Sequence, residues 1–185
     1  MLTENMKKLH AFNILQDWDK KGRYVFTRQD LSKVFFKDNP KALTESLNRL
    51  VHDGWIIRAC RGVYVNPHAH FSLDGYIVEQ IAKALRRGEY NYVSLESMLS
   101  EYGVISQIPI DRLTVMTTGR KGIFNTHYGV IEFTHTKKRI SDILPQINKI
   151  EGRPLRVATR ELAWQELKRV GRNIKMVNKA QLYAG

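Results

Sequence analysis

The sequence contains one cysteine among 185 residues and no long apolar run. A single cysteine excludes an internal disulfide, and Cys60 has no C-x-x-C partner, which favours a small packing residue over a redox group. No segment approaches the roughly 20 apolar residues that a membrane-spanning helix requires. The amino terminus also lacks the apolar region of a signal peptide. We therefore expect a cytoplasmic protein.

Acidic residues are scarce, because 18 Asp and Glu stand against 30 Lys and Arg, which gives a formal net charge of +12. The excess lies at both ends of the chain. Residues 1–66 hold twelve basic and seven acidic side chains, residues 137–185 hold twelve and four, and the stretch between them holds six and seven. Clustered positive charge points to a polyanionic partner, for which nucleic acid is the natural candidate. A merely solubilising surface needs no such clustering.

Motifs for catalysis and metal binding are missing as well. The segment 119–122 places Arg-Lys between glycines, but it joins two predicted strands, which favours a turn over a phosphate-binding loop. Glu132 lacks a lysine two residues on, so the usual carboxylate-x-lysine pattern of nucleases is absent. The pair His68-x-His70 has no adjacent Cys, Asp or Glu to complete a metal site. We predict no enzyme activity, metal or cofactor.

Residues 27–65 form the most informative stretch of the chain. Thr27 is a suitable helix cap, and apolar residues at three- and four-residue spacing after it predict a helix over 28–36. Asn39 and Pro40 then supply a second cap followed by proline at the first helical position, where its missing N–H costs nothing. We therefore predict two consecutive helices separated by a tight turn.

A predicted β-hairpin follows the second helix. Two β-rich runs, 55–59 and 63–65, flank Cys60-Arg61-Gly62, a loop whose length suits a hairpin with arginine at its tip. Helix, turn, helix and hairpin in this order are typical of a winged helix-turn-helix, whose second helix enters the major groove of DNA. Such modules also serve as protein-interaction domains. The positive charge favours the DNA-binding alternative.

The second helix carries its leucines on one side, so its opposite side is the candidate surface for DNA. Asn48 is the best candidate for reading an adenine edge, whereas Lys41 is expected on a phosphate. Arginines at the helix start and the hairpin are expected on phosphates too. The full set of expected DNA contacts comprises Arg28, Lys41, Thr44, Asn48, Arg49, Arg58 and Arg61.

The whole chain is expected to be α+β, with a winged helix-turn-helix domain followed by a mixed helix/antiparallel-strand domain. The first domain covers 1–66, the linker 66–70 and the second domain 71–185. A further helix over 4–19, capped by Thr3, completes the first domain. The second domain is expected to contain helices at 73–87, after Ser94, at 140–150 and at 160–170 after Thr159, an antiparallel meander of strands at 113–118, 123–126 and 130–135, and a short strand at 155–157.

Several segments together carry a family resemblance: TRQDL, RGVYVNP, YVSLESMLSEYGVISQIP, LTVMTTGRKGIFNTHYGVIEFTHTKK and LRVATRELAWQEL. The chain resembles, over almost its whole length, the AbiEi antitoxins of bacterial abortive-infection toxin–antitoxin systems, which are of type IV. The resemblance implies an N-terminal domain that represses the antitoxin–toxin operon at inverted repeats. It also implies a C-terminal domain that counteracts an AbiEii-type nucleotidyltransferase toxin, mostly without a stable complex. Many members have Ala-Thr-Pro-Glu before the last helix, whereas this chain has Ala-Thr-Arg-Glu at 158–161.

Basic residues of the second domain form the candidate surface for antitoxicity. They are Arg120, Lys121, Lys137, Lys138, Arg139, Arg153, Arg156 and Arg160. The same surface could instead extend the DNA footprint. We therefore expect a DNA-binding antitoxin that represses its own operon. The alternatives are a winged-helix regulator whose second domain senses a small ligand or a protein, and a DNA-processing enzyme.

Overall fold

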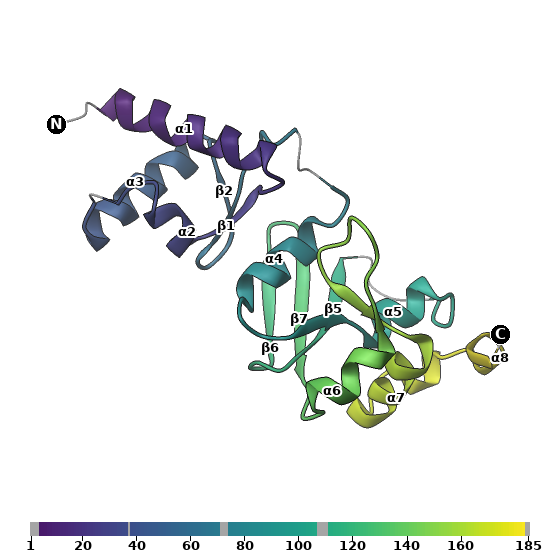
Figure 1. The fold of residues 1–185 in the computed structure, drawn as a ribbon. Coiled ribbons are helices and arrows are strands. Elements are labelled where there is room, and N and C mark those ends of the chain that lie inside the picture. Colours follow the sequence, from purple (N-terminus) through teal and green to yellow (C-terminus); the bar gives the residue numbers. More distant parts are fainter. Residues whose placement is uncertain (1–3, 37, 71–73, 107–110, 184–185) are drawn as a thin grey trace. The chain divides into compact units, whose positions relative to one another are not determined.

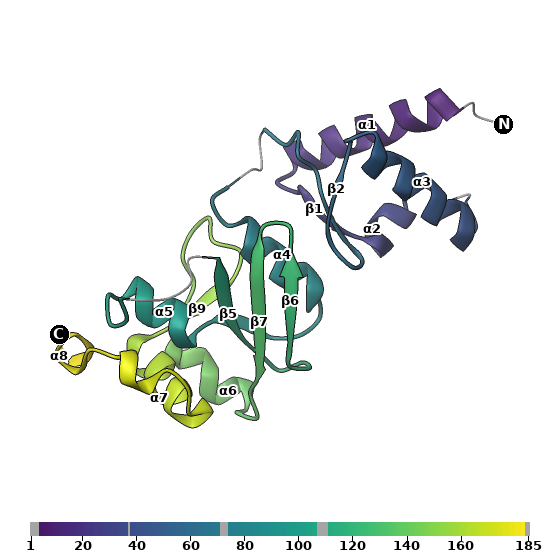
Figure 2. The same cartoon turned by 180° about the vertical axis from the view of Figure 1, so that it is seen from behind.

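The computed structural model describes residues 4–36, 38–70, 74–106 and 111–183, and it is a mixture of helices and two β-sheets (Figure 1; Figure 2 shows it from behind). The chain divides into two compact units, unit 1 (Met1–Ile77) and unit 2 (Val78–Gly185). The predicted α+β class is therefore confirmed. Thr3, the predicted cap of the first helix, lies outside the described residues.

Unit 1 combines three helices with a three-stranded antiparallel sheet of order β1-β3-β2. Its elements are α1 (Glu4–Lys20), β1 (Val25–Thr27), α2 (Arg28–Ser32), α3 (Pro40–His52), β2 (Ile57–Cys60) and β3 (Val63–Val65). The helices expected from caps and periodicity are all present. Strand β1 has only three residues, too few for alternation to show, and the sequence did not predict it.

Both predicted caps of the consecutive helices are present. Thr27 accepts a hydrogen bond from the backbone N–H of Asp30, whose carboxylate accepts one from the Thr27 backbone at 2.8 Å. Asn39 Oδ1 accepts from the N–H groups of Lys41 and Ala42. Helix α2 is shorter than the predicted 28–36, because residues after Ser32 form a turn with bonds such as Val34 N–H to Leu31 O.

A single apolar core holds unit 1 together. Leu43, Leu47 and Leu50 of α3 are buried, as their spacing predicts, against Ala11 and Leu15 of α1 and the side chains of β1 and α2. Each fully buried leucine contributes about 1.5–3 kcal/mol to folding. This packing fixes which side of α3 remains outside.

The segment expected to be a linker, residues 66–70, is bonded to unit 1. The N–H of Asn66 donates to Tyr24 O at 2.8 Å, and the N–H of His70 donates to the buried carboxylate of Asp19 at 2.8 Å. The hydroxyl of Tyr24 donates to Asp74 at 2.7 Å. Asn66, His70 and Asp74 are therefore each tied to unit 1.

Unit 2 contains a six-stranded sheet of order β6-β7-β5-β4-β9-β8. Its elements are α4 (Ile77–Leu85), β4 (Asn91–Val93), α5 (Leu95–Glu101), β5 (Arg112–Thr117), β6 (Gly122–Thr126), β7 (Gly129–His135), α6 (Ile140–Ile143), η1 (Leu144–Gln146), β8 (Ile147–Asn148), β9 (Arg156–Ala158), α7 (Arg160–Val170), η2 (Ile174–Met176) and α8 (Lys179–Tyr183). Helix α7 begins at Arg160, and its predicted cap Thr159 accepts a hydrogen bond from the N–H of Leu162.

The predicted antiparallel meander of three strands is wrong. Strands β6 and β7 pair antiparallel, but β5 pairs with β7 in parallel, so β7 lies between β5 and β6. The segment after β5 therefore joins two strands that are not neighbours, and the sheet is mixed. Alternation and loop length fit either pairing, so the sequence pattern could not distinguish them.

Two helices of unit 2 differ from their predicted ranges. Helix α4 begins at Ile77. Its predicted start, residue 73, lies outside the described residues. The predicted helix 140–150 ends at Ile143, because Pro145 removes a helical N–H donor, and the chain continues through η1 into strand β8.

Candidate nucleic-acid interface

Helix α3 presents a polar face to solvent. Lys41, Asn48 and Arg49 are exposed, on the side opposite the buried leucines. Thr44 is half-buried. The side chains expected to contact DNA bases lie on a helix that packs against the core. Their positions are therefore better defined than those of side chains on a loop.

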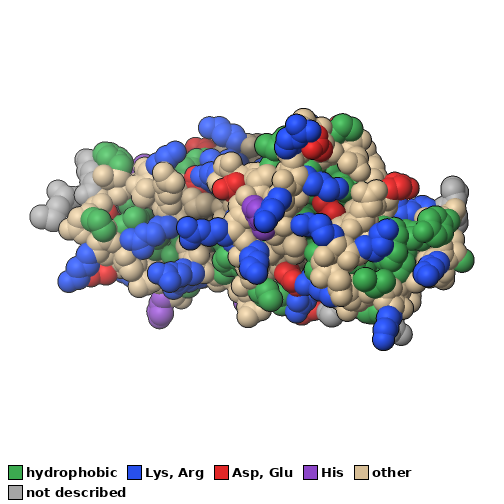
Figure 3. Space-filling model, turned by 90° about the horizontal axis from the view of Figure 1, so that it is seen from below, with side chains coloured by type: hydrophobic (Ala, Val, Ile, Leu, Met, Phe, Trp, Pro, Cys, Tyr) green, Lys and Arg blue, Asp and Glu red, His purple; other side chains and the backbone are tan. Residues whose placement is uncertain are grey.

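The β2–β3 hairpin carries two exposed arginines, Arg58 on the strand and Arg61 in the turn. Gly62 has φ of +81°, a conformation that side-chain-bearing residues rarely adopt, which lets the turn close beside Arg61. The structure therefore places Arg61 at the tip, where the sequence predicted it. Figure 3 shows one face of the molecule, across which Lys and Arg side chains (blue) are widely spread and Asp and Glu side chains (red) form small separate patches.

Arg28 and Thr44, two of the expected DNA contacts, are bonded to each other. Nη2 of Arg28 donates to Thr44 Oγ1 at 2.9 Å and to Pro40 O at 3.0 Å. The Thr44 hydroxyl in turn donates to Pro40 O at 2.8 Å. The other five residues of the expected set are exposed.

In unit 2, one sheet edge gathers five of the eight basic residues expected in the antitoxicity surface. Strands β5 and β7 run parallel, so the segments that leave them lie at the same edge, and Nδ1 of His135 lies 2.8 Å from Gly119 O. Arg139 forms an ion pair with Asp142 at 3.1 Å. The cationic edge, as we call it, comprises Arg120, Lys121, Lys137, Lys138 and Arg139.

Arg153 does not belong to an exposed surface, contrary to the expectation. Its side chain is 5% exposed and pairs with Glu79 of α4 at 2.6 Å and with Glu101 of α5 at 2.8 Å. Arg156 and Arg160 are half-buried, and Arg160 lies over the ring of Tyr102 at 5.6 Å. Spacing alone did not show that carboxylates elsewhere in the chain hold Arg153.

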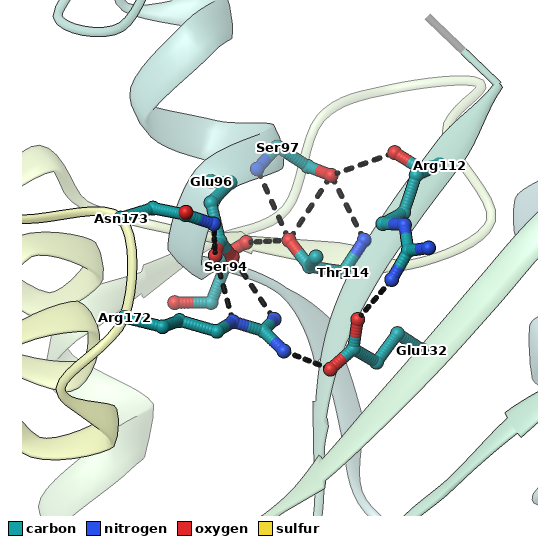
Figure 4. Close-up of polar contacts among 8 residues, drawn as sticks. All are labelled: Ser94, Glu96, Ser97, Arg112, Thr114, Glu132, Arg172 and Asn173. Atoms are coloured by element: carbon teal, nitrogen blue, oxygen red, sulfur yellow. Dashed lines mark hydrogen bonds and ion pairs between the residues drawn. The ribbon is translucent and has the colours of Figure 1, made fainter. Parts of the chain in front are cut away.

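A network of ion pairs between two half-buried arginines and two largely buried carboxylates, which the sequence did not predict, joins α5, β5, β7 and the segment after α7 (Figure 4). Arg172 donates to Glu96 at 2.7 Å and also to Glu132, which accepts a second bond from Arg112 at 2.7 Å. Burial opposes the charge of Glu132, but the two arginines outweigh it and hold the pKa of this carboxyl below its usual range. The network fastens the chain after α7 to the sheet.

Another buried carboxylate, that of Glu166, lies on the inner face of α7. Glu166 is 1% exposed and accepts hydrogen bonds from Tyr92 and Ser94, each at 2.5 Å. Burial raises the pKa of Glu166, although both hydroxyls and the nearby Lys138 and Arg169 favour its charged form. Ser94, predicted as the cap of α5, forms no side-chain cap bond, since its hydroxyl bonds Glu166 instead.

The histidine pair and the cysteine have separate local surroundings. Within the described parts of the chain, no group of three or more His, Cys, Asp or Glu side chains is placed to hold a metal ion. Nε2 of His68 lies 3.1 Å from Gly54 O. Burial raises the pKa of the Cys60 thiol. Among the described residues, none of the helices is both long and apolar enough to cross a membrane.

Comparisons with known proteins found one family model and solved structures that resemble this chain. The family model described as "Transcriptional regulator, AbiEi antitoxin" matches residues 13–67. The crystal structure of the RV2827C protein from Mycobacterium tuberculosis shares the fold, with a TM-score of 0.58 over 84% of this chain at 12% identity, and this chain covers 59% of that one. No curated protein matches the sequence. Over residues 13–67, the sequence therefore matches the AbiEi family of antitoxins and transcriptional regulators, which bears out the predicted family resemblance.

Proposed function

We propose that this chain is an antitoxin that represses its own operon by binding inverted repeats in the promoter. Unit 1 would act as a winged helix-turn-helix, with α2 and α3 as the helix pair, α3 in the major groove and the β2–β3 hairpin as the wing. The order of its elements supports this assignment. Since its ligand is chromosomal DNA, the protein would act in the cytoplasm.

The observation that carries the proposal is the exposed polar face of α3 beside a hairpin tipped by arginine. Asn48 offers both a donor and an acceptor, which suits the N6 and N7 edge of adenine. Lys41, Arg49, Arg58 and Arg61 supply positive charge for phosphates, which fix the orientation of the protein on the duplex. Sequence-specific binding needs side chains that contact the bases and other side chains that contact the phosphates. Helix α3 would provide the base contacts, and the cations around it would provide the phosphate contacts.

Unit 2 would counteract a nucleotidyltransferase-type toxin, with or without a stable complex. The cationic edge supports this part of the proposal, because its residues, most of them exposed, lie together on one edge of a rigid sheet. Arg153 no longer belongs to that surface, since it is buried in ion pairs. The cationic edge would contact an acidic face of the toxin or the nucleic acid that the toxin modifies.

Two full-length variants test this division of labour. In the first, Asn48 and Arg61 are replaced by alanine; in the second, Lys137, Lys138 and Arg139 are replaced by alanine. We expect the first to lose binding to the promoter duplex while still rescuing cells that express the cognate toxin. We expect the second to bind the promoter and fail to rescue. If the second variant rescues fully, unit 2 does not act through this edge.

The neighbouring gene provides an independent test. A nucleotidyltransferase gene directly downstream is expected of an antitoxin. A ligand-sensing regulator has no need of such a neighbour, so its absence would favour that alternative. Degradation of labelled DNA on addition of a divalent metal would instead support a DNA-processing enzyme.

A further inference from the structure

Arg28 is the point where three elements of unit 1 meet. Its backbone N–H donates to Gly62 O in the hairpin turn at 2.9 Å. Its side chain donates through a single nitrogen, Nη2, to Pro40 O and Thr44 Oγ1 in the first turns of α3. Because Arg28 is also the first residue of α2, it links both helices of the pair to the hairpin.

We propose that Arg28 is a positioning residue, which sets α3 relative to the hairpin, and that Thr44 is its receiving partner. The inference rests on the proposed DNA binding of unit 1. Asn48 stands one helical turn beyond Thr44, and Arg61 directly precedes Gly62. A shift of the bonded groups therefore displaces the base-reading and phosphate-binding side chains relative to each other. A binding surface held in its bound geometry loses less free energy on association.

The hydrogen-bond capacity of Thr44 supports this assignment over direct contact with DNA. A threonine hydroxyl has one hydrogen to donate, and Thr44 gives it to Pro40 O. The same oxygen accepts from Arg28. Thr44 thus has no hydrogen left for a base, and it acts on recognition through the position of the helix.

The chemistry of Arg28 is specific to arginine. Nη2 carries two hydrogens in a fixed plane, and the two acceptors lie at 2.9 and 3.0 Å from it. A lysine keeps the positive charge but places it on a flexible stem without this planar geometry. Arg28→Lys therefore separates the role of the geometry from the role of the charge.

The test compares Arg28→Lys, Thr44→Val, their combination and Thr44→Ser in the full chain. Each variant is titrated with the duplex upstream of its own gene and with a scrambled duplex, over a series of salt concentrations. Arg28→Lys and Thr44→Val should each reduce the preference for the upstream duplex about 10-fold, the scale of one hydrogen bond to a charged group. The combination should cost no more than the costlier of the two single changes, because both remove the bond between Arg28 and Thr44. Thr44→Ser keeps the hydroxyl and should retain the preference.

The salt dependence distinguishes positioning from a phosphate contact. We expect Arg28→Ala to leave the slope of log affinity against log salt unchanged, with thermal unfolding close to that of the wild type. A slope reduced by about 0.9 in Arg28→Ala would show a direct phosphate contact and overturn the proposal. So would a Thr44→Val variant with full preference. If the wild type shows no preference for the upstream duplex, both this inference and the proposed DNA binding fail; if Asn48→Ala is affected and Thr44→Val is not, this inference alone fails.

Discussion

In unit 1, Arg49, Arg58 and Arg61 lie exposed on helix α3 and the hairpin, whereas in unit 2 Arg153 and Arg172 lie in networks with carboxylates that are largely buried. Arginine is thus a candidate for contacting a ligand in one unit, whereas in the other it stabilises the fold through ion pairs. Unit 1 has a core that is mainly apolar, so its cations remain on the surface. Unit 2 buries Glu79, Glu96 and Glu166, and each is hydrogen-bonded to arginine or hydroxyl partners.

This difference changes what net charge says about function. Residues 137–185 carry twelve basic and four acidic side chains, which points to a strongly cationic surface. In the structure, part of that charge is neutralised internally by glutamates from earlier in the chain. Charge counted along the sequence therefore overstates the positive surface of unit 2. The cationic edge is the part of the predicted basic surface that remains.

The largest expected effect is on the stability of unit 2. Arg153→Ala leaves Glu79 buried, at 5% exposure, without its arginine, and removal of one partner from a buried pair costs about 3–5 kcal/mol. Chemical denaturation followed by a probe in unit 2 should show this loss, while promoter binding by unit 1 stays unchanged. Arg139→Ala, which removes an exposed ion pair, is the control and should leave stability as it is. Equal stability of the two variants would contradict the structural role of Arg153.

The second effect concerns recognition by unit 1. Asn48→Ala should relax the choice of DNA sequence by about 1–3 kcal/mol, because it removes hydrogen bonds to a base edge. Lys41→Ala should weaken binding to all sequences alike, since a phosphate contact carries no sequence information. Competition binding with operator and scrambled duplexes measures both. An Asn48→Ala variant with unchanged preference would show that another face of α3 enters the groove.

A smaller effect is expected on salt dependence. Arg61→Ala should lower the slope of log affinity against log salt by about 0.9, because the variant neutralises one phosphate fewer than the wild type. Lys121→Ala, on the cationic edge of unit 2, is the matched change and should leave the slope unaltered. A lower slope in both variants would mean that unit 2 extends the DNA footprint, which would remove the functional distinction between the units.

The smallest effect is a pH dependence confined to unit 2. The pKa of Glu166 in the folded protein is raised above its ordinary value of 4.5, so the folded state holds this proton more tightly than the unfolded chain. Stability from this group is therefore full below pH 4.5 and declines as pH rises through the folded-state pKa. Glu166→Gln keeps the shape and removes the titration. The free energy of unfolding of the wild type relative to Glu166→Gln should fall with rising pH; a constant difference would contradict the raised pKa.

Unit 1 was more predictable from sequence than unit 2, for reasons visible in individual residues. Thr27, Asn39 and Pro40 act within a few positions of themselves, so their sequence neighbours identify the helix starts. In unit 2, Arg172 meets Glu96 across 76 positions, and Arg153 meets Glu79 across 74. Spacing along the chain contains no comparable information about such pairs. The sequence did not predict the partners of Arg28 in unit 1 for the same reason, since Thr44 lies 16 residues away.

The sequence by itself determined the helix caps, the apolar side of α3, the hairpin with Arg61 at its tip and the family resemblance of residues 13–67, because each depends on residues close together in the chain. Only the tertiary structure decided that β7 lies between β5 and β6, that Arg153 is buried and that Arg28 bonds to Thr44. These depend on which distant segments pack together. Local periodicity fixes the side of an element that is buried, but the neighbour it is buried against follows from the packing of the whole unit.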